Sequence, residues 1–536
     1  MHRNKSVNVN KFSMVPRPDV PRSSFRMERA LKTTFDAGFL IPVFCEEVLP
    51  GDTFRTKMTA FARLQTPIVP FMDNIYLDSF FFFVPNRLVW DNWAKFMGEQ
   101  ENPGDSTSFL VPEMTSPSGG YGTNLLPGYF GLPRALVAGQ TFKHSALPLR
   151  AYNLIYNEWF RDENLQSSAV VRKGDSGDLL ADYTLRRRGK RHDYFTSCLP
   201  WPQKGASVGI PLGAHAPVRV ASSDLVTGTS VSMRLRDGAT GNYPGGSFAV
   251  GSFAGVTGIS ATAVTGGAGL YPANLYADLS TATSATINQL RQAFQIQRLL
   301  ERDARGGTRY TEKIQAHFGV RNPDARLQRP EYLGGGSTPV MLNPVAQNSA
   351  TLAGSAPLAT LSAIGTAVAH GHGFSHSFTE HGYVIGLVSA RADLTYQQGL
   401  RRHWSRRTQY DFYWPAFAML GEQAVLGKEI YCRGDGQDDS VFGYQERWAE
   451  LRYQQSEITG QFNSAAVSGF DYWHLAQNFA ARPTLGATFI EENPPMTRVL
   501  AVTNVTSAQF LMDTFFETVA ARPIPMFSVP GMADHF

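Results

Sequence analysis

The sequence has few cysteines, few charges and no long apolar run. Its three cysteines, Cys45, Cys198 and Cys432, are far apart and odd in number, which excludes a disulfide scaffold and a cysteine-based zinc site. Charged residues make up 18% of the chain, against roughly 25% in ordinary soluble domains. The longest purely apolar runs, such as residues 80–84, are too short to span a bilayer. Residues 1–12 contain charges but no apolar stretch, so no secretory signal is readable. We expect a soluble protein without membrane insertion, made in a reducing compartment.

Motifs of catalysis are also missing. No G-x-S-x-G, H-E-x-x-H or G-x-G-x-x-G is present, and the nearest approach to a phosphate loop, residues 421–429, is one residue too long and lacks the Ser/Thr that would hold magnesium. His370, His372, His376 and His381 are close together, and H-x-H on a strand would put two imidazoles on one face. A metal-dependent hydrolase is therefore one hypothesis, although we expect no catalytic residue, no metal ligand and no cofactor.

Aromatic residues are abundant instead. They make up 12% of the 536 residues, with 36 Phe and 20 Tyr, and the hydrophobic fraction is 43%. A chain of this composition can bury a large core, which excludes global disorder. Its length gives a soft prior of two to four domains. Aromatic stretches such as residues 80–83 and 404–414 fit either a core or a subunit interface.

Positive charge is unevenly placed. Residues 1–30 carry seven Lys or Arg and two acidic residues, so this segment carries +5 and the other 506 residues sum to −1. Its three prolines favour an extended arm. Two more basic clusters follow, RRRGKR at 186–191 and RRHWSRR at 401–407, the second with an aromatic residue for base stacking. A solvated loop or a charged subunit interface is the other interpretation of each cluster. The residues predicted to bind nucleic acid are Arg3, Lys5, Lys11, Arg186, Arg187, Arg188, Lys190, Arg191, Arg401, Arg402, Arg406 and Arg407.

Hydrophobic periodicity predicts strands towards both ends of the chain. Apolar and polar residues alternate over 54–64 and 509–517. Residues 75–84 (IYLDSFFFFV) are mostly apolar and are followed by Pro85, as in a strand buried on both faces. Further strands are predicted at 383–388 and 497–505. Helical spacing is found at 86–97 with Asn86 as cap, at 145–160 with Pro148 in the first turn, and at 286–304 with a Thr286/Gln289 capping box. This pattern favours a mainly β fold, an antiparallel β-sandwich of the jelly-roll type with long helical and Gly-rich loop insertions.

Two long segments are almost free of charge. Residues 239–290 contain a single charged residue, Asp278, and residues 332–379 contain none. The stretch 205–270 is also rich in glycine. Such segments can be disordered linkers. Because they contain enough Val, Leu, Phe and Tyr to pack, we favour insertions that become ordered in an assembly.

Several stretches resemble the major capsid protein of gokushoviruses, small single-stranded DNA phages of the Microviridae. They occur in the family's order and cover 54–93 (FRTKMTAFARLQTPIVPFMDNIYLDSFFFFVPNRLVWDNW), 147–165 (LPLRAYNLIYNEWFRDENL), 186–205 (RRRGKRHDYFTSCLPWPQKG), 380–400 (EHGYVIGLVSARADLTYQQGL) and 441–460 (VFGYQERWAELRYQQSEITG). The resemblance implies an eight-stranded viral jelly roll that self-assembles into a T=1 icosahedral shell of about sixty copies, through pentamers and threefold contacts, around circular single-stranded DNA. It also implies a threefold protrusion that meets the host, for which residues 205–285 are the best candidate.

The same resemblance implies partners and a location. The partners are a minor pilot protein, an internal scaffolding protein, a small basic DNA-binding protein and a host surface receptor, and the location is the virion, assembled in the host bacterial cytoplasm. The expected organisation is a basic extended arm (1–38), a first jelly-roll part with helical insertions (39–204), a Gly-rich surface insertion (205–285), a helix plus an uncharged insertion (286–379), and a second jelly-roll part with a C-terminal extension (380–536). The alternative function is a lectin-like, glycan-binding β-sandwich that forms no shell.

Overall fold

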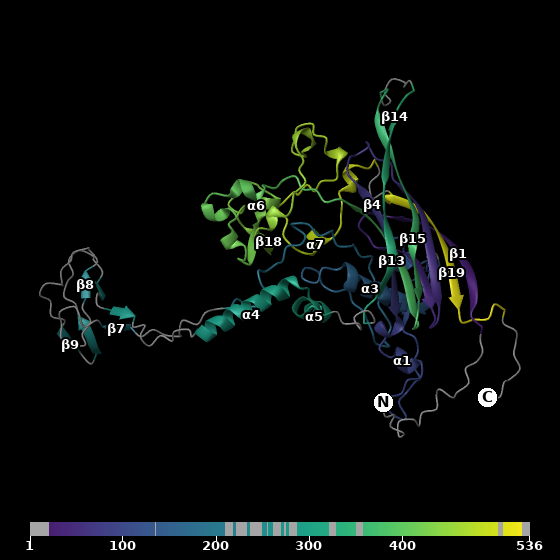
Figure 1. Ribbon diagram of the computed structural model, residues 1–536, viewed down its shortest axis with the longest axis horizontal. Coiled ribbons are helices and arrows are strands. Elements are labelled where there is room, and N and C mark those ends of the chain that lie inside the picture. Colours follow the sequence, from purple (N-terminus) through teal and green to yellow (C-terminus); the bar gives the residue numbers. More distant parts are fainter. Residues whose placement is uncertain are drawn as a thin grey trace. The chain divides into compact units, whose positions relative to one another are not determined.

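The computed structural model describes residues 21–134, 136–208, 287–320, 328–349, 357–501 and 507–527, together with the backbone of short strands between 218 and 277 (Figure 1). The chain divides into two compact units, one made of residues 1–202 and 304–536 and the other of residues 203–303. Among the described residues, no helix is long and apolar enough to cross a membrane.

Two antiparallel sheets form the body of the first unit (Figure 1). The five-stranded sheet has the order β1 (Ser23–Phe35), β19 (Phe510–Arg522), β3 (Thr53–Leu64), β15 (Leu361–Ser377) and β14 (Met341–Ala346). The four-stranded sheet has the order β13 (Glu331–Pro339), β4 (Ile75–Pro85), β16 (Gly382–Ala392) and β2 (Ile41–Val48).

The order of these strands is that of a jelly roll. If β14 is left out, eight strands remain, ordered β1-β19-β3-β15 in one sheet and β13-β4-β16-β2 in the other. The chain changes sheet at every step between successive strands except from β4 to β13, as in two interlocked Greek keys. The predicted mainly β jelly roll is therefore confirmed, and β14 is an additional strand that forms a hairpin with β15.

Alternating side chains explain why these strands form one core. Every second residue of β3 and β19 is buried, as predicted, and most of β4 is buried as well. Phenylalanines meet between the sheets: the ring centroids of Phe44 on β2 and Phe516 on β19 lie 5.2 Å apart, and those of Phe81 on β4 and Phe374 on β15 lie 5.3 Å apart. Each such buried ring contributes about 1.5–3 kcal/mol.

Two boundaries predicted from the sequence were wrong. Residues 23–35 of the predicted arm form β1, because Phe25, Met27 and Leu31 alternate with exposed residues and pair with β19. The uncharged stretch 332–379, predicted to be an insertion, supplies the sheet strands β13, β14 and β15. Its glycines allow close packing, since a Cβ on Gly334 would lie 2.5 Å from the carbonyl oxygen of Gly373 on β15.

The connection from β4 to β13 carries the first insertion. The predicted helix at 145–160 is confirmed as α3 (Leu147–Ile155), with proline in its first turn, followed by a π-helical turn (Tyr156–Phe160). The helix predicted at 86–97 is broken into a 3-10 turn (Asn86–Leu88) and α1 (Trp93–Phe96), and Asn86 caps neither. The remaining elements are β5 (Glu113–Thr115), α2 (Leu126–Tyr129), β6 (Lys143–Ser145), a 3-10 turn (Leu180–Asp182) and α5 (Tyr310–Phe318).

Helix α3 covers the outer face of the four-stranded sheet. Its Leu149, Tyr152 and Ile155 belong to a buried cluster with Phe82 of β4 and Ile385 of β16. The hydroxyl of Tyr152 donates a 2.9 Å hydrogen bond to the carbonyl oxygen of Leu40. The sandwich therefore has one sheet whose outer face is packed beneath the first insertion.

The connection from β16 to β19 carries the second insertion. It contains β17 (Glu422–Leu426), α6 (Gly427–Ile430), β18 (Val441–Glu446) and α7 (Ala487–Ile490). Its short 3-10 helices are Arg402–Ser405, Gln409–Asp411, Pro415–Phe417, Ala449–Leu451, Gly460–Phe462, Asp471–Trp473 and Met496–Arg498. The strand predicted at 497–505 is absent from its described part, residues 497–501.

The second unit contains nested antiparallel pairs. β9 (Ala249–Phe253) pairs with β10 (Val256–Ser260), β8 (Met233–Leu235) with β11 (Leu270–Pro272), and β7 (Val218–Val220) with β12 (Leu275–Ala277). The predicted helix at 286–304 follows as α4 (Ile287–Arg305), whose last two residues belong to the first unit.

Candidate nucleic-acid interface

The first basic cluster is an extended segment held on both sides, which we call the arginine strap (residues 186–191). On one side, the amide of Arg188 donates to the carbonyl oxygen of Gly38 (2.8 Å). On the other, the amide of Glu492 donates to the carbonyl oxygen of Arg188 (2.9 Å). Gly38 has φ +85°, and a Cβ there would lie 2.0 Å from the carbonyl oxygen of Glu492. The strap thus joins the β1–β2 connection to the segment after α7.

Two strap arginines are engaged inside the protein. The guanidinium of Arg187 donates to the carbonyl oxygens of Ala37 (3.1 Å) and Glu492 (3.0 Å) and stacks over Phe39, and burial lowers its pKa. Arg188 forms a 2.6 Å ion pair with the buried carboxylate of Asp78. These side chains hold the strap to the sandwich.

The carboxylate of Asp78 is shared by several donors. Arg391 approaches it at 2.9 Å and the hydroxyl of Ser337 at 2.5 Å. Burial alone would raise the pKa of Asp78, but the hydrogen bonds from Ser337 and Arg188 and the charges of Arg188 and Arg391 hold it below its usual value. Asp78 is therefore ionised and links the strap to strands of the four-stranded sheet.

The remaining strap cations differ in exposure. Arg186 lies over the ring of Tyr156, and Lys190 lies over the ring of Phe489, where burial lowers the lysine's pKa. Arg191 is exposed and its side chain makes no ion pair with any described residue. Of the predicted strap residues, Arg191 presents its charge to solvent.

A cavity of about 750 Å³ lies beside the strap, and we call it the strap pocket. Its walls combine aromatic rings with cations: Phe80, Phe82, Trp159, Phe160 and Tyr332, and Arg161, Arg188, Lys190, Arg191, Arg305 and Arg309. Trp159 and Tyr332 both lie against Phe82, and they remain 39% and 44% exposed. Planar apolar rings beside cations suit a nucleobase and its phosphate.

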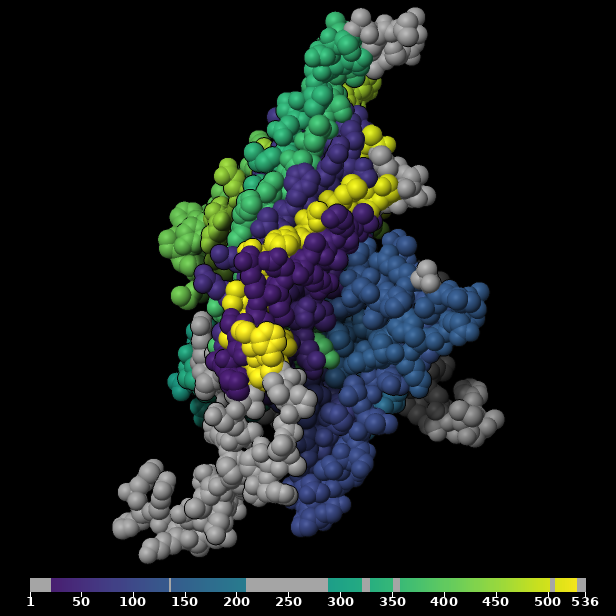
Figure 2. All heavy atoms as spheres, turned by 90° about the vertical axis from the view of Figure 1, so that its right-hand side faces the viewer, coloured from purple at the N-terminus to yellow at the C-terminus, as the bar shows by residue number. Residues whose placement is uncertain are grey.

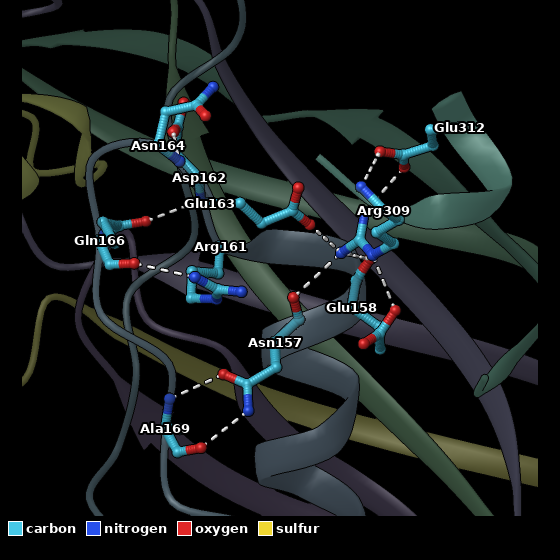
Figure 3. A network of polar contacts seen from close by, with 10 residues as sticks. All are labelled: Asn157, Glu158, Arg161, Asp162, Glu163, Asn164, Gln166, Ala169, Arg309 and Glu312. Carbon is cyan, nitrogen blue, oxygen red and sulfur yellow. Dashed lines mark hydrogen bonds and ion pairs between the residues drawn. The ribbon is translucent and has the colours of Figure 1, made fainter. Parts of the chain in front are cut away.

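Not all of the pocket's charge is free, as Figure 3 shows. Arg309 is held by Glu158 (2.9 Å), by Glu312 (2.9 Å) and by Glu163, and it donates to two backbone carbonyls. Arg161 donates to the carbonyl oxygen of Gln166 (2.9 Å), and its Nε has no partner among the described residues. The charge available to a ligand therefore comes from Arg161 and Arg191, since Lys190 is packed against Phe489.

The second basic cluster is mostly engaged as well. Arg402 pairs with Glu429 (2.9 Å), Arg406 with Glu450 (3.1 Å) and Arg401 with Glu457 (2.6 Å). Burial raises the pKa of Glu429, against the opposing charge of Arg402. These three arginines line cavities other than the strap pocket.

Two residues of that cluster remain open to solvent. Arg407 is exposed and its side chain makes no ion pair in the described part of the chain. Trp404 is 73% exposed, and its ring lies 4.9 Å from that of His403 at a tilt of 40°. The predicted arm residues Arg3, Lys5 and Lys11 lie outside the described residues.

The histidines considered for metal binding make other contacts. His372 is buried, with Nδ1 2.8 Å from the hydroxyl of Ser79 and Nε2 3.0 Å from that of Thr338, so both ring nitrogens are occupied. His376 lies beside Glu331 (3.7 Å). The described residues contain no group of three or more His, Cys, Asp or Glu placed to hold a metal ion.

Sequence reasoning missed one basic row. The solvent face of β3 carries Arg55, Lys57 and Arg63 beside the exposed ring of Phe61. The period-two pattern of residues 54–64 contained this signal, because the residues that alternate with the buried ones point to the opposite face. A charge scan for dense clusters does not find cations spaced two residues apart.

Comparisons with known proteins give one consistent result. A family model described as "Capsid protein (F protein)" matches residues 13–532. The chain is 47% identical to capsid protein VP1 of Bdellovibrio phage phiMH2K over 99% of both chains. It is 45% identical to capsid protein VP1 of Chlamydia phage 1 and 36% identical to that of Spiroplasma virus 4, in each case over 98% of both chains.

Proposed function

The chain belongs to the capsid protein (F protein) family, and from that premise we propose that it self-assembles into a T=1 icosahedral shell around circular single-stranded DNA. As a capsid protein of Microviridae phages it is a structural component of the virion and not an enzyme. A T=1 shell contains about sixty copies, which meet as pentamers and at threefold axes.

An exposed apolar run on the second insertion carries the assembly proposal. Residues 412–421 contain no charged residue, yet Phe412, Tyr413, Trp414 and Met419 are 48–96% exposed. Large exposed apolar patches usually mark contact surfaces. Neighbouring copies would remove these side chains from water, and aromatic residues are enriched in the centre of such interfaces.

DNA contact is assigned to the predicted residues that are not already bonded within the chain. Arg191 at the strap pocket and Arg407 beside Trp404 are exposed, whereas Arg186, Arg187, Arg188, Lys190, Arg401, Arg402 and Arg406 are packed or paired. Arg3, Lys5 and Lys11 keep the same assigned role.

The chain's net charge of +4 multiplied over about sixty copies falls far short of a genome's thousands of phosphates. A small basic DNA-binding protein, polyamines or metal ions therefore share the neutralisation.

Further partners belong to the same proposal. A minor pilot protein and an internal scaffolding protein take part in assembly in the host cytoplasm, and residues 205–285 form a threefold protrusion that contacts a host receptor. The nested strand pairs between 218 and 277 give this segment a compact unit of its own, which suits a protrusion.

Microscopy of the purified full-length protein tests the proposal. Uniform icosahedral shells a few tens of nanometres across, containing nuclease-protected single-stranded DNA when taken from producing cells, are the expected result. Small oligomers that bind immobilised glycans and form no shells, even with the scaffolding partner present, would favour the lectin-like alternative.

A further inference from the structure

The outer face of the five-stranded sheet has no covering insertion among the described residues of the first unit. Figure 2 looks onto this face, where β1 (purple) and β19 (yellow) lie at the surface beside β3 and β15. The other sheet is covered by α3. This face is thus available except at one end, where residues 123–134 of the first insertion border it.

On this face, the cations of one strand, β3, lack carboxylate partners among the described residues. The carboxylates of the face are taken up by cations of β1, since Arg26 pairs with Glu28 (2.8 Å) and Glu517 (3.4 Å), and Lys32 with Asp513 (3.0 Å). The cations of β3, Arg55, Lys57 and Arg63, make no ion pair with any described residue. They form an unpaired row along the middle strand.

An apolar strip lies among these cations. Phe61 of β3 is 49% exposed, and its register partners are Asp513 of β19 and Val368 of β15. Phe515 and Val519 extend the strip along β19 at 39% and 45% exposure. Solvent-facing rings on a sheet, with cations beside them, are the arrangement on which bases of a single strand stack.

A cavity of about 520 Å³ lies at one end of the same face. Phe61 supplies an aromatic wall, Lys32, Arg63 and Arg134 supply cations, and Thr123, Asn124 and Tyr129 supply polar atoms. Its lining therefore offers a stacking surface, positive charge and hydrogen-bonding groups, as a nucleotide requires.

We propose that the solvent face of the five-stranded sheet binds single-stranded DNA, with a base against Phe61 and phosphates at Arg55, Lys57 and Arg63. This rests on the proposed enclosure of DNA and adds a second surface that would meet it, on the sheet opposite to the one that supplies Phe80 and Phe82 to the strap pocket. A second copy of the chain fits less well, because burying three unpaired cations without carboxylates opposite is costly and lysine is depleted from interface centres.

Equilibrium binding of a labelled oligothymidylate of about 16 nucleotides to the full-length protein over a salt series tests the site. In the triple variant Arg55→Gln/Lys57→Gln/Arg63→Gln, the slope of log K against log salt should fall by about 2, since each phosphate contact to a single strand contributes about 0.7. The matched control Lys143→Gln/Arg433→Gln/Arg452→Gln removes three exposed cations from the insertions and should keep the slope.

A second pair of variants tests stacking without changing charge. Phe61→Leu should weaken binding about fivefold or more, whereas Phe61→Tyr keeps a ring and should bind like the wild type. This pair also decides the case if the triple variant does not fold.

Wild-type affinity and slope in both sets of variants would overturn the site. Normal DNA binding by variants that no longer form shells would overturn it as well, because that result would mark an interface between copies. A wild-type protein that binds no DNA would remove the DNA part of the proposed function together with this site, whereas DNA-binding shells with unaffected variants would remove this site alone.

Discussion

At the level of single side chains, an arginine can meet a phosphate only if no group of its own chain already holds it. Arg188 is held by Asp78 and Arg402 by Glu429, although both belong to dense basic clusters. Arg191 and Arg407, in the same clusters, are exposed. The clusters could be predicted from the sequence, but their pairing could not, because Arg188 and Asp78 are 110 residues apart along the chain.

Removing free and engaged arginines should therefore have different effects. The double variant Arg191→Gln/Arg407→Gln should form shells with less nuclease-protected DNA, because each lost contact weakens phosphate binding. Arg187→Gln should instead lower the yield of folded protein, since it leaves the carbonyls of Ala37 and Glu492 without a donor. Particle yield and DNA per particle, measured for each variant, separate the two roles. Normal DNA content in the double variant would contradict the assignment.

The carboxylate of Asp78 should make stability depend on acid pH. Because its pKa is lower in the folded than in the unfolded chain, it stabilises the fold above the unfolded value of about 3.9, and this contribution is lost as the pH falls through the lower folded value. Asp78→Asn leaves Arg188 and Arg391 without their buried partner and should cost about 3 kcal/mol at pH 7.

Thermal unfolding of both proteins between pH 7 and pH 3 measures this effect. The melting temperature of Asp78→Asn should lie below that of the wild type at pH 7, and the difference should shrink below about pH 4. A difference that stays constant down to pH 3 would show that ionisation of Asp78 does not stabilise the fold.

At the level of elements, strands that alternate strictly were predictable and strands built from small residues were not. Residues 54–64 and 509–517 reveal β3 and β19 because one face is buried and the other is solvated. β13 reads EYLGGGSTP, which resembles a loop, since glycine is unfavourable in strands in general. In β13, glycine is required because atoms of β15 lie too close to leave room for a Cβ, which only the three-dimensional structure reveals.

Gly336 of β13 gives the sharpest test of that explanation. A Cβ on Gly336 would lie 2.4 Å from the ring of His372, which is itself held by Ser79 and Thr338. Gly336→Ala should destabilise the sandwich by about 1–3 kcal/mol and lower its melting temperature. The control Gly436→Ala introduces a Cβ with no atom within 4 Å and should melt like the wild type. Equal melting temperatures would mean that His372 moves aside without cost.

At the level of the whole molecule, the fold class was predictable and the path of the insertions was not. Strands near both ends of the chain, with long segments between them, indicate a sandwich closed by β1 and β19. The contacts that fix the insertions join distant residues, such as Arg187 with Glu492, 305 residues apart, and Trp159 with Pro330, 171 apart. No local pattern encodes such pairs, so the strap pocket could not be predicted.

Assembly is a property of many copies together and not of a single chain. The exposed aromatic residues of the second insertion allow it to be tested by substitution. If residues 412–421 are buried between copies, Trp414→Glu would place a charge in an apolar contact and should abolish shells. The isolated subunit should remain folded, because Trp414 is 52% exposed and its indole nitrogen bonds only within its own turn, to the carbonyl oxygen of Gln409. The control Leu110→Glu places the same charge on another exposed apolar residue, 86% exposed in the first insertion, and should leave shell formation intact. Microscopy counts the shells and thermal unfolding checks the fold. Normal shells from Trp414→Glu would place the subunit contacts elsewhere, whereas loss of shells with an unchanged melting temperature would locate an interface on the second insertion.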